Sequence, residues 1–204
     1  MALLSLCAAL NGCATGRATP SVRKGLIDRL STLKSGRHPG RMPSRDGRGA
    51  EGGSAWKNGP SRLSVAAVRR TAGEWRWPLE RVVVTSSFGK RSGRVHEGVD
   101  LKAAAGTPVL AVQQGEVIYA GSGIGGYGRL VVLEHPSGLY SVYAHNSKLL
   151  VKRGERVRKG QRVSLSGQSG HATGPHLHFE IRKGERALDP ELILPVAEQR
   201  VASR

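Results

Sequence analysis

The stretch G-P-H-L-H-F-E-I, residues 174–181, alternates polar and apolar side chains along the chain. Side chains of a β-strand point in turn to its two faces. His176, His178 and Glu180 are therefore expected on one face of a strand, and the apolar residues that follow each of them on the other face, packed into the core. A single His-x-His pair is a weak signal of function, because exposed histidine pairs are common on strands.

Similar short runs of strand-forming residues fill the C-terminal part of the chain. We expect strands over residues 82–88, 109–112, 116–120, 130–135, 139–144, 163–166 and 176–182. Turn residues separate them, and Pro136-Ser137-Gly138 indicates a hairpin. Strands at this spacing, without helices between them, favour antiparallel pairing. The sequence thus predicts an all-β domain, an antiparallel β-sandwich or partly open barrel, over residues 74–195, followed by a tail at 196–204.

The chain is strongly basic, and most of the excess charge precedes this domain. Lys and Arg number 32 against 15 Asp and Glu, which gives a formal net charge of +17. Residues 14–73 hold 13 of the basic residues and three acidic ones, and ten of the 25 residues at 36–60 are Gly or Pro. Such a stretch buries too little apolar surface to offset the entropy lost on ordering. We expect a disordered, flexible basic linker at 14–73, with short helical turns weakly indicated near 26–33 and 63–70.

The first 13 residues are typical of an export signal. Residues 1–10 carry no charged side chain and are too few to span a bilayer. Residues 10–14, L-N-G-C-A, are similar to the lipobox of bacterial lipoproteins, which implies that Cys13 becomes a lipid-modified N-terminus. Ala14 after the cysteine resembles lipoproteins of the outer membrane, so the implied location is the periplasmic side of the cell envelope. Asn11 and the missing basic residues depart from the pattern, and leave an ordinary signal peptide or a misassigned start codon as alternatives.

Two further motifs place histidines among the predicted strands. In His96-Glu97-Gly98-Val99-Asp100, a helix would bring the first and last residues together, with Glu97 placed as in H-E-x-x-H metalloproteases. Gly98 and the β-branched residue after it disfavour a helix, so we expect a tight turn at Gly98 with Glu97 pointing elsewhere. A third donor from another strand would complete two His and one Asp, a set that leaves the fourth zinc position open for water, as in catalytic sites. The second motif, Tyr143-Ala144-His145, ends a strand and on its own indicates a structural histidine.

Taken together, these motifs resemble the lysostaphin-type (LytM-type) zinc peptidoglycan endopeptidases. H-x-x-x-D, Y-A-H and G-P-H-L-H-F-E occur in the family's order, and the likeness extends over residues 77–195. Smaller motifs match in register, namely Ser87-Phe88-Gly89, Gly106-Thr107-Pro108-Val109, Gly115-Glu116-Val117, Lys159-Gly160-Gln161 and Asp189-Pro190. The resemblance implies an all-β fold of the duplicated hybrid motif type.

The resemblance also implies the chemistry. It assigns one zinc ion to the domain, with His96, Asp100 and His178 as ligands, and it makes His145 and His176 the catalytic pair. One of the pair acts as general base and the other stabilises the oxyanion, in an order that the sequence leaves open. The implied substrates are the stem peptides and cross-bridges of bacterial peptidoglycan. Some relatives have lost ligands and activate amidases. All five positions are present here, which implies an enzyme, with a non-hydrolytic wall-binding or amidase-activating module as the alternative.

The remaining motifs and histidines give weaker evidence of function. Residues 123–128 match G-x-G-x-x-G, but a strand-like run follows where a dinucleotide site needs a helix, so we interpret them as a flexible connection. His135 is expected to be structural or to support the side chains of the site, His171 to lie in a loop near the site, and His38 to be inert in the linker. A nucleic-acid partner is not expected, because the chain outside the linker has no recognisable nucleic-acid motif or aromatic stacking platform.

The lipobox generates the first testable prediction. If Cys13 carries the anchor, Cys13→Ser should move the protein from the membrane fraction to the soluble periplasmic fraction, because a single signal anchors the chain. Fractionation of cells that express each form measures this. Identical partitioning of the two forms would contradict lipidation at Cys13.

Overall fold

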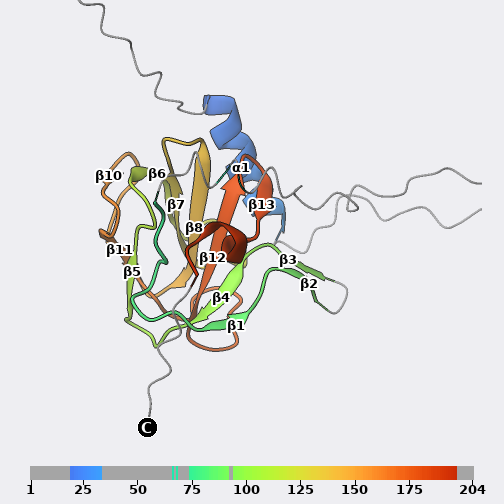
Figure 1. Ribbon diagram of the computed structural model, residues 1–204, viewed down its shortest axis with the longest axis vertical. Helices are drawn as coiled ribbons and strands as arrows, with labels where there is room; N and C mark the ends of the chain where they lie inside the picture. The colour runs from blue at the N-terminus through green and yellow to red at the C-terminus, as the bar shows by residue number, and fades with distance from the viewer. Residues whose placement is uncertain (1–18, 34–65, 67, 69–73, 92–93, 197–204) are drawn as a thin grey trace, which may run out of the picture.

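The computed structural model describes residues 19–33, 66, 68, 74–91 and 94–196. Within them, strands dominate and helices are few (Figure 1), which confirms the predicted all-β fold. The predicted signal segment with Cys13, and His38, lie outside the described residues. No helix in the described part of the chain is long and apolar enough to cross a membrane.

One large antiparallel sheet forms the centre of the domain. Its strands run in the order β1 (Val84–Ser86), β4 (Val99–Lys102), β12 (His176–Lys183), β8 (Leu139–Asn146), β7 (Arg129–Glu134), β6 (Gly115–Gly121) and β10 (Arg156–Val157), with β13 (Arg186–Leu188) paired to β12. A three-stranded sheet is formed by β5 (Pro108–Leu110), β11 (Arg162–Leu165) and β9 (Lys148–Leu149). The hairpin β2 (Gly89–Arg91) and β3 (Arg94–His96) and the short helix α3 (Pro190–Ile193) complete the domain.

The inner face of the large sheet packs against the small sheet. Leu177, Phe179 and Ile181 of β12 are fully buried there, in one cluster with Val109 of β5 and Val163 of β11. The alternation predicted for residues 176–181 is therefore confirmed on its apolar side. Burying three large side chains from one strand makes β12 the centre of the core.

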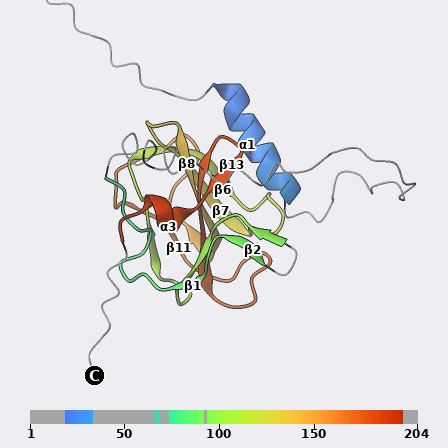
Figure 2. The same ribbon diagram turned by 45° about the vertical axis from the view of Figure 1, so that its right-hand side comes forward.

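The opposite, outer face of the large sheet is covered by a helix. Helix α1 (Pro20–Leu33) lies across it, as Figures 1 and 2 show from two sides. Leu26 and Leu30, one helical turn apart, are fully buried. They belong to one cluster with side chains from the central strands and the loop before β7, namely Ile118, Ile124, Tyr127, Leu130, Val132, Tyr140, Val142 and Ala144.

The flexibility expected of the linker is therefore wrong over Pro20–Leu33, whereas the helical turn indicated near 26–33 is confirmed as part of α1. Residues 66 and 68, within the turn indicated near 63–70, are helical as well, while residues 14–18, 34–65, 67 and 69–73 lie outside the described residues. The physical reason is the central strand β8, whose eight residues are all buried. A strand buried on both faces needs a cover on each side. The sequence of this strand, L-Y-S-V-Y-A-H-N, could have indicated the need for a second cover.

Docking of α1 generates the second prediction. Leu30→Ala should lower the free energy of unfolding by about 2–5 kcal/mol, because it leaves a cavity between helix and sheet. Val22, on the same helix and 41% exposed, provides the matched control, and Val22→Ala should change stability by about 0.5 kcal/mol or less. Urea unfolding of both variants measures the difference. Equal effects would mean that α1 does not pack on the sheet in solution.

Candidate metal centre

The outer face of the large sheet gathers the predicted site residues. Strand β12 pairs with β4 on one side and β8 on the other, in a register that places His178 opposite both Asp100 and Ala144. Directly opposed residues share a face, so His178 and Asp100 leave the sheet on the side that α1 partly covers. His96 comes from the end of β3 and reaches the same point.

A tight turn at Gly98 makes this approach feasible, as the sequence predicts. A Cβ at Gly98 would lie 2.4 Å from the carbonyl oxygen of Phe179 and 2.8 Å from Cγ of Glu180, so no other residue fits. Residues 96–100 form strand, turn and strand in place of a helix. Glu97 is not part of the cluster of candidate ligands and pairs instead with Arg182 at 3.0 Å. The alternative based on H-E-x-x-H is thereby excluded.

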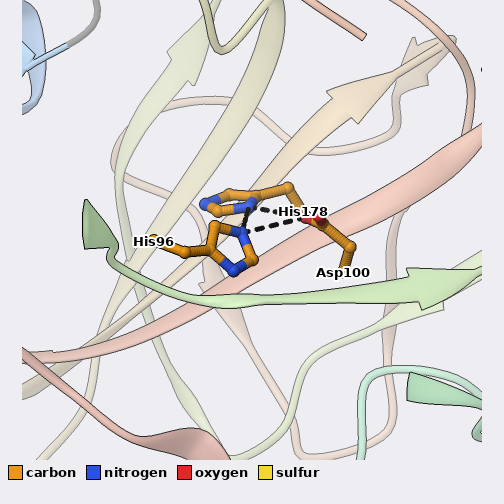
Figure 3. Close-up of side chains that lie close together, drawn as sticks. All are labelled: His96, Asp100 and His178. Atoms are coloured by element: carbon orange, nitrogen blue, oxygen red, sulfur yellow. Dashed lines mark hydrogen bonds and ion pairs between the residues drawn. The ribbon is translucent and has the colours of Figure 1, made fainter. Parts of the chain in front are cut away.

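Three side-chain atoms converge in the site (Figure 3). Oδ1 of Asp100 lies 3.0 Å from Nδ1 of His178 and 3.2 Å from Nε2 of His96, and these two nitrogens are 3.1 Å apart. The predicted ligands thus form a nearly equilateral triangle. Four ligands at roughly 2.0–2.1 Å around a tetrahedral zinc ion lie about 3.3 Å from one another. The spacing of the three atoms fits that requirement.

The hydrogen bonds of the two rings determine which nitrogens face the centre. Nδ1–H of His96 donates to the carbonyl of Ser87 at 2.9 Å, and Nε2–H of His178 donates to Oε1 of Glu180 at 2.9 Å. A neutral imidazole has a single N–H, so the nitrogens that face Asp100 present lone pairs. Two lone pairs and a carboxylate that point at one another repel unless a cation lies among them. This donor set suits a divalent metal ion.

The charge of the buried Glu180 agrees with this arrangement. Burial opposes ionisation of Glu180, but the hydrogen bond from Nε2–H of His178 and the charge of Arg182 outweigh it and lower the pKa of Glu180 to about 2. Glu180 is therefore anionic at neutral pH and accepts the proton-bearing side of the His178 ring.

The predicted catalytic histidines lie beside the triangle. The ring centres of His145 and His176 are 4.7 Å apart, and that of His145 is 5.9 Å from His178. His145, at the end of β8, has a φ of 63°, which is uncommon for a residue with a side chain. Its Nδ1–H donates to the carbonyl of Ser169 at 2.8 Å, and Nδ1–H of His176 donates to that of Gly174 at 2.9 Å. In both rings Nε2 is left as the acceptor.

All five predicted side chains are thus brought together, while the other described histidines are not part of the cluster. His171 is exposed, and its backbone N–H donates to the carbonyl of Gly126. His135 is buried and packs edge-on against Trp75 with ring centres 4.7 Å apart. The structural role expected for His135 is confirmed.

The glycine-rich loop at 123–128 is not the flexible connection that we expected. A Cβ at Gly128 would lie 2.4 Å from Oγ of Ser169, and one at Gly170 would lie 2.4 Å from the nitrogen of Gly128, so the two loops pack backbone to backbone. This packing fixes Tyr127, which is 1% exposed and donates from its hydroxyl to Oε1 of Glu180 at 2.6 Å. Glycines there permit close approach rather than motion.

Sequence reasoning missed the side chains that support the ligands. The alternation of β12 places Glu180 on the correct face but indicates no role for it. Tyr127 occupies a variable position of the glycine-rich motif at 123–128, and Arg182 belongs to no recognised motif. A signal was present, because the alternation of β12 continues beyond Glu180 to Arg182 and puts four polar residues on one face. Polar side chains in the middle of a buried strand need partners, and that need predicts a network.

Buried His135 generates a prediction about pH. Burial lowers the pKa of His135 to about 4 from its ordinary 6.5, against the opposing effect of its hydrogen bond to the carbonyl of Gln114. The neutral ring therefore stabilises the fold fully above pH 6.5, and this contribution is lost as the pH falls towards 4. The loss should be about 3 kcal/mol.

Urea unfolding at pH 7 and pH 4.5, with a chelator present, tests this assignment. His135→Gln should remove most of the dependence between these two values. His171→Gln, at an exposed position, serves as the control and should retain it. The assignment would be wrong if both variants kept the slope of the wild type.

Comparison with known proteins identifies relatives for this domain. Residues 94–190 match Peptidase family M23. The lipoprotein NlpD/LppB homolog of Pseudomonas aeruginosa is 40% identical over 123 residues, which cover 60% of this chain and 40% of that protein. The murein hydrolase activator NlpD of Escherichia coli K12 is 36% identical over 121 residues, which cover 59% and 31%. The chain thus spans less than half the length of these curated relatives.

Solved structures agree with the sequence relatives. The catalytic domain of the prophage-encoded M23 protein EnpA from Enterococcus faecalis, solved as a point mutant, is 36% identical with a TM-score of 0.52, and the match covers 55% of this chain and 91% of that one. A zinc containing peptidase from Vibrio cholerae is 35% identical with a TM-score of 0.55, over 60% of this chain and 41% of that one.

Proposed function

The chain belongs to the LytM-type peptidases of family M23, and we propose that it is a zinc-dependent endopeptidase that hydrolyses the peptide cross-links of bacterial peptidoglycan. The observation that carries the proposal is the convergence of all five side chains on one face of the sheet. His96, Asp100 and His178 would hold the zinc ion, and His145 and His176 would act on the substrate. The names of a murein hydrolase activator and of a zinc containing peptidase among the relatives support the substrate and the metal.

The proposed mechanism assigns a proton-carrying atom to each catalytic histidine. Zinc, when bound, polarises the scissile carbonyl and lowers the pKa of the attacking water. Since Nδ1–H of His145 and of His176 is held by a backbone carbonyl, the proton of the water goes to Nε2 of one of the two rings. The other ring can donate from Nε2 only when it carries a proton on both nitrogens, and in that imidazolium form it stabilises the oxyanion and contributes about 3 kcal/mol to the lowering of the barrier. The same carbonyls keep both rings in the orientation that this transfer needs.

A second candidate function is favoured by one comparison. The NlpD of Escherichia coli is named as an activator of murein hydrolases, and it is 36% identical over the matched residues. A chain of that kind would bind the wall or an amidase without cutting peptide bonds. The complete triangle of donors at 3.0–3.2 Å supports the enzyme instead, because an activator has no need of a metal centre with an open position.

The proposed location is the periplasmic side of the cell envelope, with an anchor in the outer membrane through lipidated Cys13. The relative from Pseudomonas aeruginosa is named as a lipoprotein, which supports this location. We propose residues 14–73 as a basic linker from the anchor to the domain, with the docked helix α1 within it, and residues 74–195 as the peptidase domain.

The charge of the domain is consistent with peptides that end in carboxylates. Seven exposed basic side chains and one acidic side chain lie between residues 148 and 162, on β9, β10, β11 and their loops. The remainder of residues 74–196 holds ten basic and ten acidic residues. The net charge of the domain is thus concentrated on one segment, which attracts anionic groups of the wall and does so less at high salt.

The division of labour within His176-Leu177-His178 generates the fourth prediction. His178→Ala should lose both zinc and activity, because only two ligands remain. His176→Ala should keep nearly one zinc per chain and lose about a hundredfold or more in rate, as expected for a general base or an oxyanion donor. Leu177→Asp should fail to fold, because that side chain is fully buried in the core. Zinc analysis of the purified variants, with activity, measures all three.

The assignment of His176 and His178 is reversed if His176→Ala is the metal-free protein.

The broader proposal is tested by mass spectrometry of the products released from purified peptidoglycan by the full chain loaded with zinc. Products cut within stem peptides or cross-bridges, absent with His176→Ala, support the endopeptidase. Absence of products, together with stimulation of a purified amidase, would establish the activator instead.

A further inference from the structure

A buried ion-pair network connects the candidate metal centre with helix α1. Arg182 of β12 is fully buried, and its Nη1 donates to Oε2 of Glu180 at 2.5 Å and to Oε2 of Glu97 at 3.0 Å. Its other terminal nitrogen, Nη2, donates to the backbone carbonyl of Glu185. One guanidinium therefore joins β12 to the turn between β3 and β4. That turn directly follows His96, so the network connects the segments that carry two of the three predicted ligands.

Both oxygens of Glu180 are engaged in this network. Oε1 accepts from Nε2–H of His178 at 2.9 Å and from the hydroxyl of Tyr127 at 2.6 Å, while Oε2 accepts from Arg182. A carboxylate held on both sides cannot rotate, and the ring that it contacts is fixed with it. Nδ1 of His178 then faces Asp100 at 3.0 Å. The orientation of His178 thus depends on a chain of contacts that ends at Arg182.

Helix α1 extends the network beyond the domain matched by the family. Nη2 of Arg29 lies 3.7 Å from Oε1 of Glu97, and the helix that carries it is held by the buried Leu26 and Leu30. Arg23, six residues earlier, pairs instead with Glu116 and Glu134 on β6 and β7. The helix therefore has one arginine directed at the support of the metal centre and one directed at a different part of the sheet.

We propose that Arg182 is a positioning residue that aims Glu180 at His178, and that α1, through Arg29 and Glu97, belongs to the support of the metal centre. The inference rests on the proposed function for the identity of the metal. Loss of groups that orient a metal-bound histidine lowers metal affinity by about 10- to 100-fold. An exposed pair such as that of Arg29, whose side chain is 42% exposed, has a smaller effect, roughly two- to fivefold.

The test measures zinc affinity of the full chain, stripped of metal, by competition with a fluorescent chelator. Arg182→Met and Glu180→Gln should weaken zinc binding about 10- to 100-fold and shift the visible spectrum of the cobalt-substituted protein. Arg29→Met should weaken zinc binding roughly two- to fivefold. Arg23→Met is the matched control on the same helix. It should lower thermal stability and leave zinc affinity unchanged.

Arg182→Met leaves two carboxylates without their shared partner, so this variant also has a folding cost. Circular dichroism shows whether it folds, and Glu180→Gln, which keeps an acceptor for His178, carries the test where it does not. The inference is overturned if folded Arg182→Met or Glu180→Gln binds zinc like the wild type, or if Arg23→Met and Arg29→Met lower affinity equally. A wild-type chain that binds no zinc overturns the proposed function as well, whereas one that binds zinc but cuts no peptide overturns the proposed function alone.

Discussion

The structure depends on the alternation of strand β12 between two paired strands. Its apolar residues fill the core between the sheets, while His176, His178, Glu180 and Arg182 leave the opposite face. A shift of one residue in the pairing with β4 and β8 would exchange the two sets, burying the histidines in the core and exposing Leu177 and its apolar neighbours. The same hydrophobic burial that fixes the register thus places His178 opposite Asp100. The stability of the fold and the geometry of the site therefore both depend on the register of β12.

A second constraint on the site is that three hydrogen-bond acceptors, two ring nitrogens and one carboxylate oxygen, lie close together. Nε2 of His96, Nδ1 of His178 and a carboxylate oxygen lie 3.0–3.2 Å apart, and each ring is held in that orientation by an acceptor on its far side. For His96 that acceptor is the backbone of Ser87, whereas for His178 it is the buried Glu180. A backbone carbonyl needs no further support, but a buried carboxylate needs a cation. Arg182 supplies that cation. Glu97 belongs to the same network because one guanidinium contacts the carboxylates of both Glu180 and Glu97.

The sequence allowed prediction of those parts that rest on local patterns. Period-two alternation indicated β12 and its two faces, and Gly98 indicated the turn that brings His96 to Asp100. Two features were not predictable in this way. Docking of α1 depends on two leucines that match the outer face of strands far away in the chain, and propensity alone gives such a helix little support. The glycines at 123–128 suggested mobility, whereas their lack of a side chain serves close packing against Ser169 and Gly170.

Because α1 packs on the face that carries the site, the functional unit begins before the residues that match the family. Residues 94–190 include every described strand except β1 and β2, but they do not include α1. The outer face that carries the site also carries Tyr140, Val142 and Ala144, which are fully buried. In the pairing of β8 with β12, Tyr140 lies opposite Arg182, Val142 opposite Glu180 and Ala144 opposite His178. Without a cover, water would reach these apolar side chains and the buried ion pairs beside them, and the ion pairs would weaken. Because α1 packs into the same cluster as these β8 side chains, it protects the environment in which Glu180 and Arg182 act.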